Sequence, residues 1–304
     1  MYLIDFVKRI VRQSNVPIII YLVLNIFIIG FALMFMFELE FITAFVIGII
    51  LYSISMAIAL SPIGEWVLRF QNGCKKITRQ DQLNYIMPLF AEVYSQAKEK
   101  DSTIPDDVKL FIANDSTPNA FATGRKTICI TEGLLQVPDN QIKATLAHEF
   151  GHLSNKDTDL ILVITIGNAI VTILMVIIRL IVAFINLIMG IFGLFLGGSE
   201  GFITTITSVV SGFLMDVFIV GGMWLWTKIG TLFIMKSSRE HEYDADKFAL
   251  ELGYGNELCA LLDNIDNTHT TGLFAQLAGS HPDKNDRINK LQELGATYRQ
   301  GYAN

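Results

Sequence analysis

Two histidines and a glutamate near the middle of the chain have the types and spacing of a water-activating metal site. His148, Glu149 and His152 occur in ATLAHEFGHLSNKDTD, residues 144–159. Residues four apart on a helix leave the same face one turn apart, so both imidazoles can bind one Zn²⁺ ion at about 2.0–2.1 Å. Glu149 lies beside them, where its carboxylate can take a proton from water. The alternative is a metal-free amphipathic helix that carries two histidines by chance.

A catalytic zinc site also needs a third protein ligand and an open position for water. Six residues in the polar C-terminal region are candidates: Glu240, His241, Glu242, Asp244, Asp246 and His281. The stretch 238–253, SREHEYDADKFALELG, is predicted to be a helix closed by Gly253, with Glu242 and Asp246 on one face. One of these carboxylates could bind the metal while the other braces a ligating histidine. A solvated acidic helix is the alternative.

The composition indicates a membrane protein. Of 304 residues, 52% are hydrophobic and only 17% are charged, whereas about 25% are charged in ordinary soluble domains. The net charge of −6 argues against a nucleic-acid partner, because phosphate binding needs a basic face. The three scattered cysteines form no CxxC pair, so they are expected to be packing residues in a reducing compartment.

Long apolar runs account for this composition. Residues 16–37 and 41–60 are separated only by 38–40, so they are predicted to form a hairpin of two membrane-spanning helices. The first run is too long for a signal peptide, and no convincing cleavage site follows it. A third block, 160–235, is long enough for two to four helices. It is interrupted by Arg179, by a loop signal at 197–201 and by Asp216.

The polar sequence around these runs predicts a small α+β domain in two halves. In the first half, apolar residues within 83–97 recur at helical spacing, and 108–113 and 127–131 are predicted strands. Residues 139–153 are predicted to form the helix that carries the two histidines, with Asp139 as its N-cap. The segment between the strands, NDSTPNAFATGRK, is expected to be a loop. In the second half, helices are expected near 239–252, 256–265 and 284–294.

Basic residues flank the predicted spans on one side only. They are Lys8, Arg9 and Arg12 before the first span, Arg69, Lys75, Lys76 and Arg79 after the second, and Lys236 and Arg239 after the last. The connection at 38–40 and the loop signal at 197–201 carry only acidic charges. The positive-inside rule therefore places the N-terminus, the polar domain and the C-terminus in the cytoplasm.

Four motifs, in this order, resemble those of the HtpX-type membrane zinc endopeptidases, which are related to the CaaX-processing prenyl-protein membrane proteases. They are NAFATG (119–124), HEFGH (148–152), EYDAD (242–246) and HPD…R (281–287). HEFGH alone occurs in many unrelated zinc proteases, whereas HEFGH followed across an apolar hairpin by EYDAD is far more specific. The resemblance covers nearly the whole chain. One departure is the long apolar stretch 181–212, which the family pattern does not place.

The resemblance implies a gluzincin-type site with one Zn²⁺ ion per chain. His148, His152 and Glu242 would bind the metal, and Glu149 would be the general base. Asp246 would brace a ligating histidine from behind.

The resemblance also suggests supporting residues around this site. His281 and Arg287 would approach the metal from outside the ligand set and stabilise the transition state, although a surface-loop histidine is the alternative for His281. Apart from the resemblance, a peptide substrate needs to enter as an extended strand, and residues 119–123, with Asn119, Ala120 and Phe121 foremost, are expected to supply the strand edge for it. Turn or packing roles are the alternative.

A shared metal constrains the topology. Because His152 and Glu242 would bind one ion, the block 160–235 must cross the membrane an even number of times. Two crossings, roughly 160–180 and 214–235, are the simplest solution, with Arg179 at the far interface. We therefore expect an α-helical integral membrane protein with about four transmembrane helices and a cytoplasmic α+β zincin-like (gluzincin) domain. Its expected parts are a transmembrane pair (1–61), the first catalytic half (62–158), a transmembrane hairpin region (159–236) and the second catalytic half (237–304).

The predicted function is that of a zinc metalloendopeptidase in the inner (plasma) membrane. As the resemblance implies, it would cleave membrane or misfolded proteins on the cytoplasmic side, in protein quality control and the stress response. The expected partners are polypeptide substrates and the lipid bilayer, without nucleic acid. The alternatives are a membrane scaffold or adaptor with a structural zinc site, and a zinc hydrolase acting on lipids or lipidated peptides. Glu149 argues against the scaffold, because a structural site needs no base.

Overall fold

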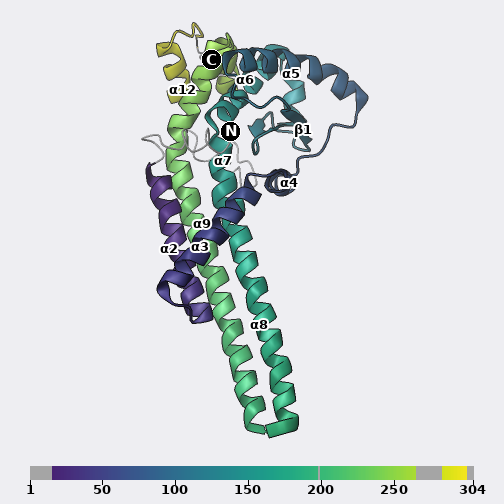
Figure 1. Ribbon diagram of the computed structural model, residues 1–304. Helices are drawn as coiled ribbons and strands as arrows, with labels where there is room; N and C mark the ends of the chain where they lie inside the picture. The colour runs from purple at the N-terminus through teal and green to yellow at the C-terminus, as the bar shows by residue number, and fades with distance from the viewer. Residues whose placement is uncertain (1–15, 198, 265–282, 300–304) are drawn as a thin grey trace. The chain divides into compact units, whose positions relative to one another are not determined.

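The structure is a computed structural model that describes residues 16–197, 199–264 and 283–299 (Figure 1). The chain divides into two compact units. One contains Leu60–Leu162 and Phe233–Asn304, and the other contains Pro17–Ala59 and Val163–Leu232. This division follows the polar and apolar segments of the sequence, so the polar unit is assembled from two stretches that the apolar helices separate.

The apolar unit consists of helices. It comprises α2 (Val16–Phe37), α3 (Phe41–Ala59), α8 (Asn168–Gly197) and the first part of α9 (Ser199–Glu251). Among the described residues, three helical segments are long and apolar enough to cross a membrane: Ile18–Phe35, Phe41–Ala59 and Asp157–Phe192. The predicted class, a helical membrane protein, is confirmed. The number of four spans stays a prediction, because several side chains between 214 and 235 lie outside the described residues.

The stretch 181–212, which the family pattern does not place, continues two long helices. In Figure 1, α8, which ends at Gly197, and the first part of α9, which begins at Ser199, run side by side as a hairpin. The break between the two helices falls within the loop signal at 197–201, while the helices extend well beyond the crossings predicted at roughly 160–180 and 214–235. A β-carbon at Gly212 would lie 3.1 Å from Arg179 Nη2, so Arg179 lies against α9 partway along the hairpin. Residues 180–189 contain no glycine or proline that would end the helix.

A buried polar cluster ties α2, α8 and α9 together. Asn25 Nδ2 donates to Asn168 Oδ1 at 2.8 Å, and Asn168 Nδ2 donates to the Tyr21 hydroxyl at 2.8 Å. Trp226 closes the cluster, since its indole N–H donates to Asn25 Oδ1 at 2.9 Å and its ring stacks on Tyr21 at 4.7 Å. In apolar surroundings such bonds have no water to replace them. They fix the start of α8, which follows a π-helical turn, η3 (Leu162–Gly167).

A three-stranded sheet lies at the centre of the polar unit. Its order is β1 (Lys109–Ala113), β3 (Thr127–Thr131), β2 (Ala120–Ala122), with β1 and β3 parallel and β2 antiparallel to β3. The strand β2 lies where only a loop was expected. It can pair because Gly124 adopts a left-handed conformation, φ +72°, that returns the chain sharply into β3.

The polar unit also contains several helices. They are α4 (Pro62–Gln71), α5 (Gln80–Lys100), α6 (Asp139–Asn155), α7 (Asp157–Ile161), the end of α9, α10 (Gly255–Asn264) and α12 (Lys284–Glu293), with a 3₁₀ turn η2 (Gly133–Gln136). The predicted helices are present, although the stretch near 239–252 is the end of α9, and Pro138 rather than Asp139 takes the N-cap position of α6. The helix α6 is exposed in its first turn and mostly buried from Ile142 to Ser154, and Phe150 stacks on Tyr94 of α5 at 5.4 Å.

Candidate metal centre

The histidines of HEFGH project from the buried helix α6 toward a single point. His148 and His152 follow one another by one turn, with ring centroids 4.8 Å apart. Their Nε2 atoms lie 3.2 Å apart. The local spacing that predicted a pair of metal-binding imidazoles therefore matches the geometry of the helix.

The helix α9 brings Glu242 to the same point. Its Oε2 lies 3.5 Å from His148 Nε2, and its Oε1 lies 3.4 Å from His152 Nε2. In a tetrahedral zinc site with bonds of about 2.0–2.1 Å, neighbouring ligand atoms lie roughly 3.4 Å apart. The set of His148, His152 and Glu242 thus forms a triangle of the size that one zinc ion needs.

The close approach of α6 and α9 depends on two small residues. A β-carbon at Gly151 would lie 2.7 Å from the Cα of Ala245. Gly151 lies between the two histidines of the motif, and Ala245 follows Glu242 by one turn. The glycine of HEFGH and the alanine of EYDAD therefore let the carboxylate of one helix reach the imidazoles of the other.

We predict that Gly151→Ala weakens the metal site without unfolding the polar unit. The new methyl group must push α9 away, and a misplacement of about 1 Å can cost about 10²-fold in activity. Zinc content and peptide hydrolysis should both fall in the purified variant, whereas Asn140→Ala, at an exposed position in the first turn of the same helix, should behave like the wild type. Full zinc content and full activity in Gly151→Ala would show that the helix separation is not limiting.

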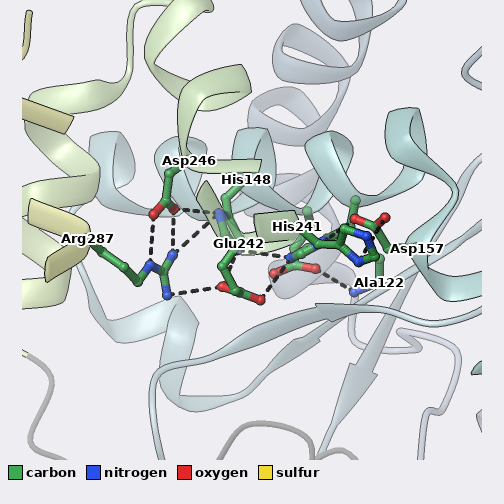
Figure 2. A network of polar contacts seen from close by, with 9 residues as sticks. Ala122, His148, Asp157, His241, Glu242, Asp246 and Arg287 are labelled. Carbon is green, nitrogen blue, oxygen red and sulfur yellow. Dashed lines mark hydrogen bonds and ion pairs between the residues drawn. The ribbon is translucent and has the colours of Figure 1, made fainter. Parts of the chain in front are cut away.

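Two carboxylates, one behind each histidine, orient the imidazoles (Figure 2). His148 Nδ1 lies 2.9 Å from Asp246 Oδ1, and His152 Nδ1 lies 3.0 Å from Asp157 Oδ2. A carboxylate at Nδ1 fixes the tautomer that leaves Nε2 available for a metal. The same carboxylate also makes the ring a better ligand.

The charges around the imidazoles favour a cation. Burial alone would lower the pKa of His148, yet Asp246 and Glu242 raise it above its ordinary value. Burial likewise opposes protonation of His152, but Asp157 and Glu242 hold its pKa well above the usual range. A metal ion must therefore displace protons from this site, and its affinity falls at low pH.

Arg287 of α12 lies behind the carboxylates. Its side chain is buried and contacts Asp246 through Nε to Oδ2 at 2.8 Å and Nη2 to Oδ1 at 2.5 Å. Its Nη1 lies 3.2 Å from Glu242 Oε2. Burial raises the pKa of Asp246, but Arg287 outweighs this effect and lowers it, so the carboxylate stays ionised. Arg287 therefore braces Glu242 and Asp246 directly, and its predicted action on the transition state stays a prediction.

Glu149 lies beside the imidazoles and contacts the edge of the sheet. Its Oε2 accepts a hydrogen bond from the Ala122 backbone N–H at 2.6 Å. The side chain is only 6% exposed. A buried carboxylate between the ligand triangle and a strand edge is suitably placed to exchange protons with a reacting group there.

The predicted strand edge differs in detail from the structure. Asn119 is paired with Thr131, since Thr131 N–H donates to Asn119 O at 2.9 Å, and Thr123 N–H donates to Thr127 O at 2.9 Å. In an antiparallel pair, alternate residues face the partner strand. Asn119 and Phe121 therefore face β3, whereas Ala120 and Ala122 turn their backbone groups to the outer edge. Ala122 is the residue of this edge that contacts Glu149.

The other candidates for the third ligand lie elsewhere. His241 is buried with its Nδ1 3.3 Å from Asp157 Oδ1, while Glu240 and Asp244 are exposed. His281 lies outside the described residues. Asp157 is a residue that the sequence analysis missed. Its position five residues after the second histidine of HEFGH was the only signal in the sequence.

Comparisons with known proteins show which family the chain belongs to. The family model of peptidase family M48 matches residues 88–295, a range that includes the ligand triangle, Glu149 and Arg287. The chain belongs to peptidase family M48. The resemblance to HtpX-type membrane metalloproteases is thereby confirmed at the level of the family.

Several individual relatives are named as homologues of the protease HtpX. A protease HtpX homolog of Sulfurihydrogenibium sp. is 26% identical over 228 residues, which are 64% of this chain and 70% of the relative. One from Dictyoglomus thermophilum is 25% identical and aligns over 63% of this chain and 65% of its own. One from Streptococcus gordonii is 26% identical over 82% of this chain and 80% of its own.

A solved structure, that of S. mikatae Ste24p, is 19% identical and has a TM-score of 0.41, covering 95% of this chain and 65% of that one. The alignments span about two thirds of the first two relatives and of Ste24p.

Proposed function

We propose that this member of family M48 is a zinc metalloendopeptidase that cleaves polypeptides next to the membrane. The observation that carries the proposal is the triangle of His148, His152 and Glu242, with Glu149 beside it and hydrogen-bonded to the edge of the sheet. A structural zinc site would need no such base, which argues against a scaffold without activity.

The residues of the chain have separate roles in the proposed reaction. A bound zinc ion would supply a polarised water and a Lewis acid for the scissile carbonyl. Glu149 would accept the proton of the attacking water and deliver it to the leaving amine. The outer edge of β2, at Ala120 and Ala122, would hold the substrate as an added strand. Asp246, Asp157 and Arg287 would keep the ligands in position.

The test of the proposed function is zinc content together with cleavage. The purified full-length protein should bind about one zinc ion per chain, because the described residues form one set of three ligands. It should also cleave casein or an unfolded membrane protein. A chelator should stop the cleavage, and added zinc should restore it. Bound zinc without cleavage of any polypeptide would favour the scaffold, whereas cleavage of prenylated peptides alone would favour a hydrolase for lipidated substrates.

We further propose that the polar unit lies in the cytoplasm and acts on membrane or misfolded proteins, in quality control. This orientation follows from the basic residues that flank the apolar runs. The metal site demands that both halves of the polar unit face the same side, because ligands of one ion lie within a few ångströms of each other and the hydrocarbon core is about 30 Å thick.

Cysteine labelling tests this topology. In a background without Cys74, single cysteines at Gln71, Asn155 and Asn256 should resist an impermeant thiol reagent added to intact cells and should react once the cells are opened. A cysteine at Ser199, where α9 begins, should react from outside. Labelling of Asn155 and Asn256 from opposite sides would exclude the shared metal site.

A further inference from the structure

The short helix α4 buries one face in the polar unit and exposes the opposite face. Gly64, Glu65 and Leu68 are buried. On the opposite face, Ile63 is 61% exposed, Trp66 60% and Phe70 76%, and the rings of Trp66 and Phe70 stack at 6.0 Å. The spacing of three and four residues puts these large apolar side chains in one stripe. A tryptophan at the centre of such a stripe is typical of segments that lie at a membrane surface.

The covalent chain holds this stripe close to a membrane. The helix α3, which is long and apolar enough to span one, ends at Ala59, and α4 begins at Pro62. The two residues between them limit the separation of Ala59 and Pro62 to about 11 Å at full extension. A bilayer has a headgroup layer of about 5–8 Å on each side of its hydrocarbon core. Whatever the arrangement of the two units, α4 begins in or beside that layer.

The start of α4 is fixed by local contacts. Ser61 caps the helix, since its hydroxyl accepts the Ile63 N–H at 3.2 Å, and Pro62 stands at the first helical position. The helix α4 is therefore a separate helix with its own N-cap and not a continuation of α3. The exposed Lys75 and Lys76 follow shortly after α4, and their charges suit anionic headgroups.

The buried face of α4 holds the turn between β2 and β3. Glu65 Oε1 accepts the Arg125 backbone N–H at 3.0 Å, and Arg69 Nη1 donates to Thr127 Oγ1 at 3.1 Å. The fit is tight, because a β-carbon at Gly124 would lie 2.7 Å from Glu65 Cγ. The same turn carries the chain from Ala122, whose N–H contacts Glu149. Contacts with this turn therefore connect α4 to the strand edge at the metal centre.

We propose that α4 is an interfacial helix that binds the lipid bilayer through Ile63, Trp66 and Phe70 and so seats the strand edge at the membrane surface. The occupant of the stripe is the lipid at the boundary between headgroups and acyl chains. The bilayer is the partner that the connection to α3 brings within reach in every state of the protein. This proposal does not depend on the proposed peptidase activity.

Fluorescence quenching in vesicles tests the proposal. The full-length protein is reconstituted in phosphatidylcholine–phosphatidylglycerol vesicles that contain lipids brominated either near the headgroup end or near the tail end of the acyl chains. The emission of Trp66 is obtained as the difference between the wild type and Trp66→Phe, so that Trp224 and Trp226 cancel. We expect both brominated lipids to quench this emission, and we expect stronger quenching by the lipid with bromine near the headgroups.

A matched control uses α5, which Figure 1 shows on the other side of the sheet from α4. In the Trp66→Phe background, Ser95→Trp places an indole at an exposed position of α5. The emission of this new tryptophan is the difference between the double variant and Trp66→Phe. It should keep its intensity in both kinds of brominated vesicle. Because both substitutions are at exposed sites, metal content and secondary structure should be unchanged, which checks the fold of each variant.

Several results would overturn the proposal. One is Trp66 emission that is quenched no more than that of the tryptophan at position 95. Another is stronger quenching by bromine near the tail ends, which would place α4 inside the hydrocarbon core. A third is efficient cross-linking of a Phe70→Cys variant to a second copy of the chain in the same vesicles, without quenching of Trp66, which would assign the stripe to a dimer contact.

Discussion

Glu149→Gln should keep the metal and the fold but lower peptide hydrolysis by about 10²–10⁴-fold, the usual contribution of a general base. The substituted amide has almost the same shape, and its oxygen can still accept the Ala122 N–H that Glu149 accepts at 2.6 Å. What it cannot do is take a proton from water. The loss should therefore appear in turnover and not in zinc content or melting temperature, all measured on the same purified sample.

A matched substitution separates this effect from a general change in charge. Glu240 is exposed on α9 and is not part of the ligand triangle. The Glu240→Gln variant should therefore hydrolyse peptides at the wild-type rate. Near-normal turnover in a metal-loaded Glu149→Gln protein would remove Glu149 from the reaction. It would leave the family assignment untouched, because that assignment does not depend on one residue.

The part of the site that could be predicted from the sequence is the part that one helix determines. His148 and His152 lie on the same face of α6 by local spacing alone. Glu242 and Asp246 could be paired for the same reason on α9. Which of these two carboxylates reaches the metal is a matter of packing between helices, and local spacing left it open. The resemblance to a family supplied that choice.

The residues that the sequence analysis missed depend on contacts between elements or on unusual backbone. Asp157 reaches His152 because Lys156 adopts a left-handed conformation, φ 61°, that ends α6 and turns the chain. Lysine gives no local signal for such a conformation. Gly151 matters because of the backbone of Ala245, far along the chain. The strand β2 exists through its pairing with β3, and three residues carry too little pattern to predict it.

The apolar segments show a similar limit. Hydropathy predicted membrane helices, and such helices are present among the described residues. It did not predict that α8 and α9 extend through 181–212, because an apolar sequence without breakers is compatible with any helix length. Length alone also does not say which part of a helix lies in the bilayer, since tilt and anchoring residues decide that.

The second large effect is expected at the third ligand. Glu242→Ala should reduce zinc affinity by more than the 10–100-fold that loss of a supporting residue typically costs. The substitution removes one corner of the triangle, in which Oε1 and Oε2 of Glu242 lie 3.4 and 3.5 Å from the two imidazoles. Two neutral imidazoles would then have to hold a dication without a ligating carboxylate. Zinc retained after dialysis against a graded chelator measures the effect.

Two further variants make this result interpretable. Asp246→Ala should fall in the 10–100-fold range itself, because Asp246 contacts His148 and Arg287 and lies one turn beyond the ligand. Glu242→Gln keeps the volume of the side chain, so a loss of zinc in this variant cannot be attributed to a cavity. The buried Arg287 keeps its partner Asp246 in both Glu242 variants, so the fold should survive. Unchanged zinc affinity in Glu242→Gln and Glu242→Ala would refute the assigned ligand set, whatever the activity of the Glu149 variant.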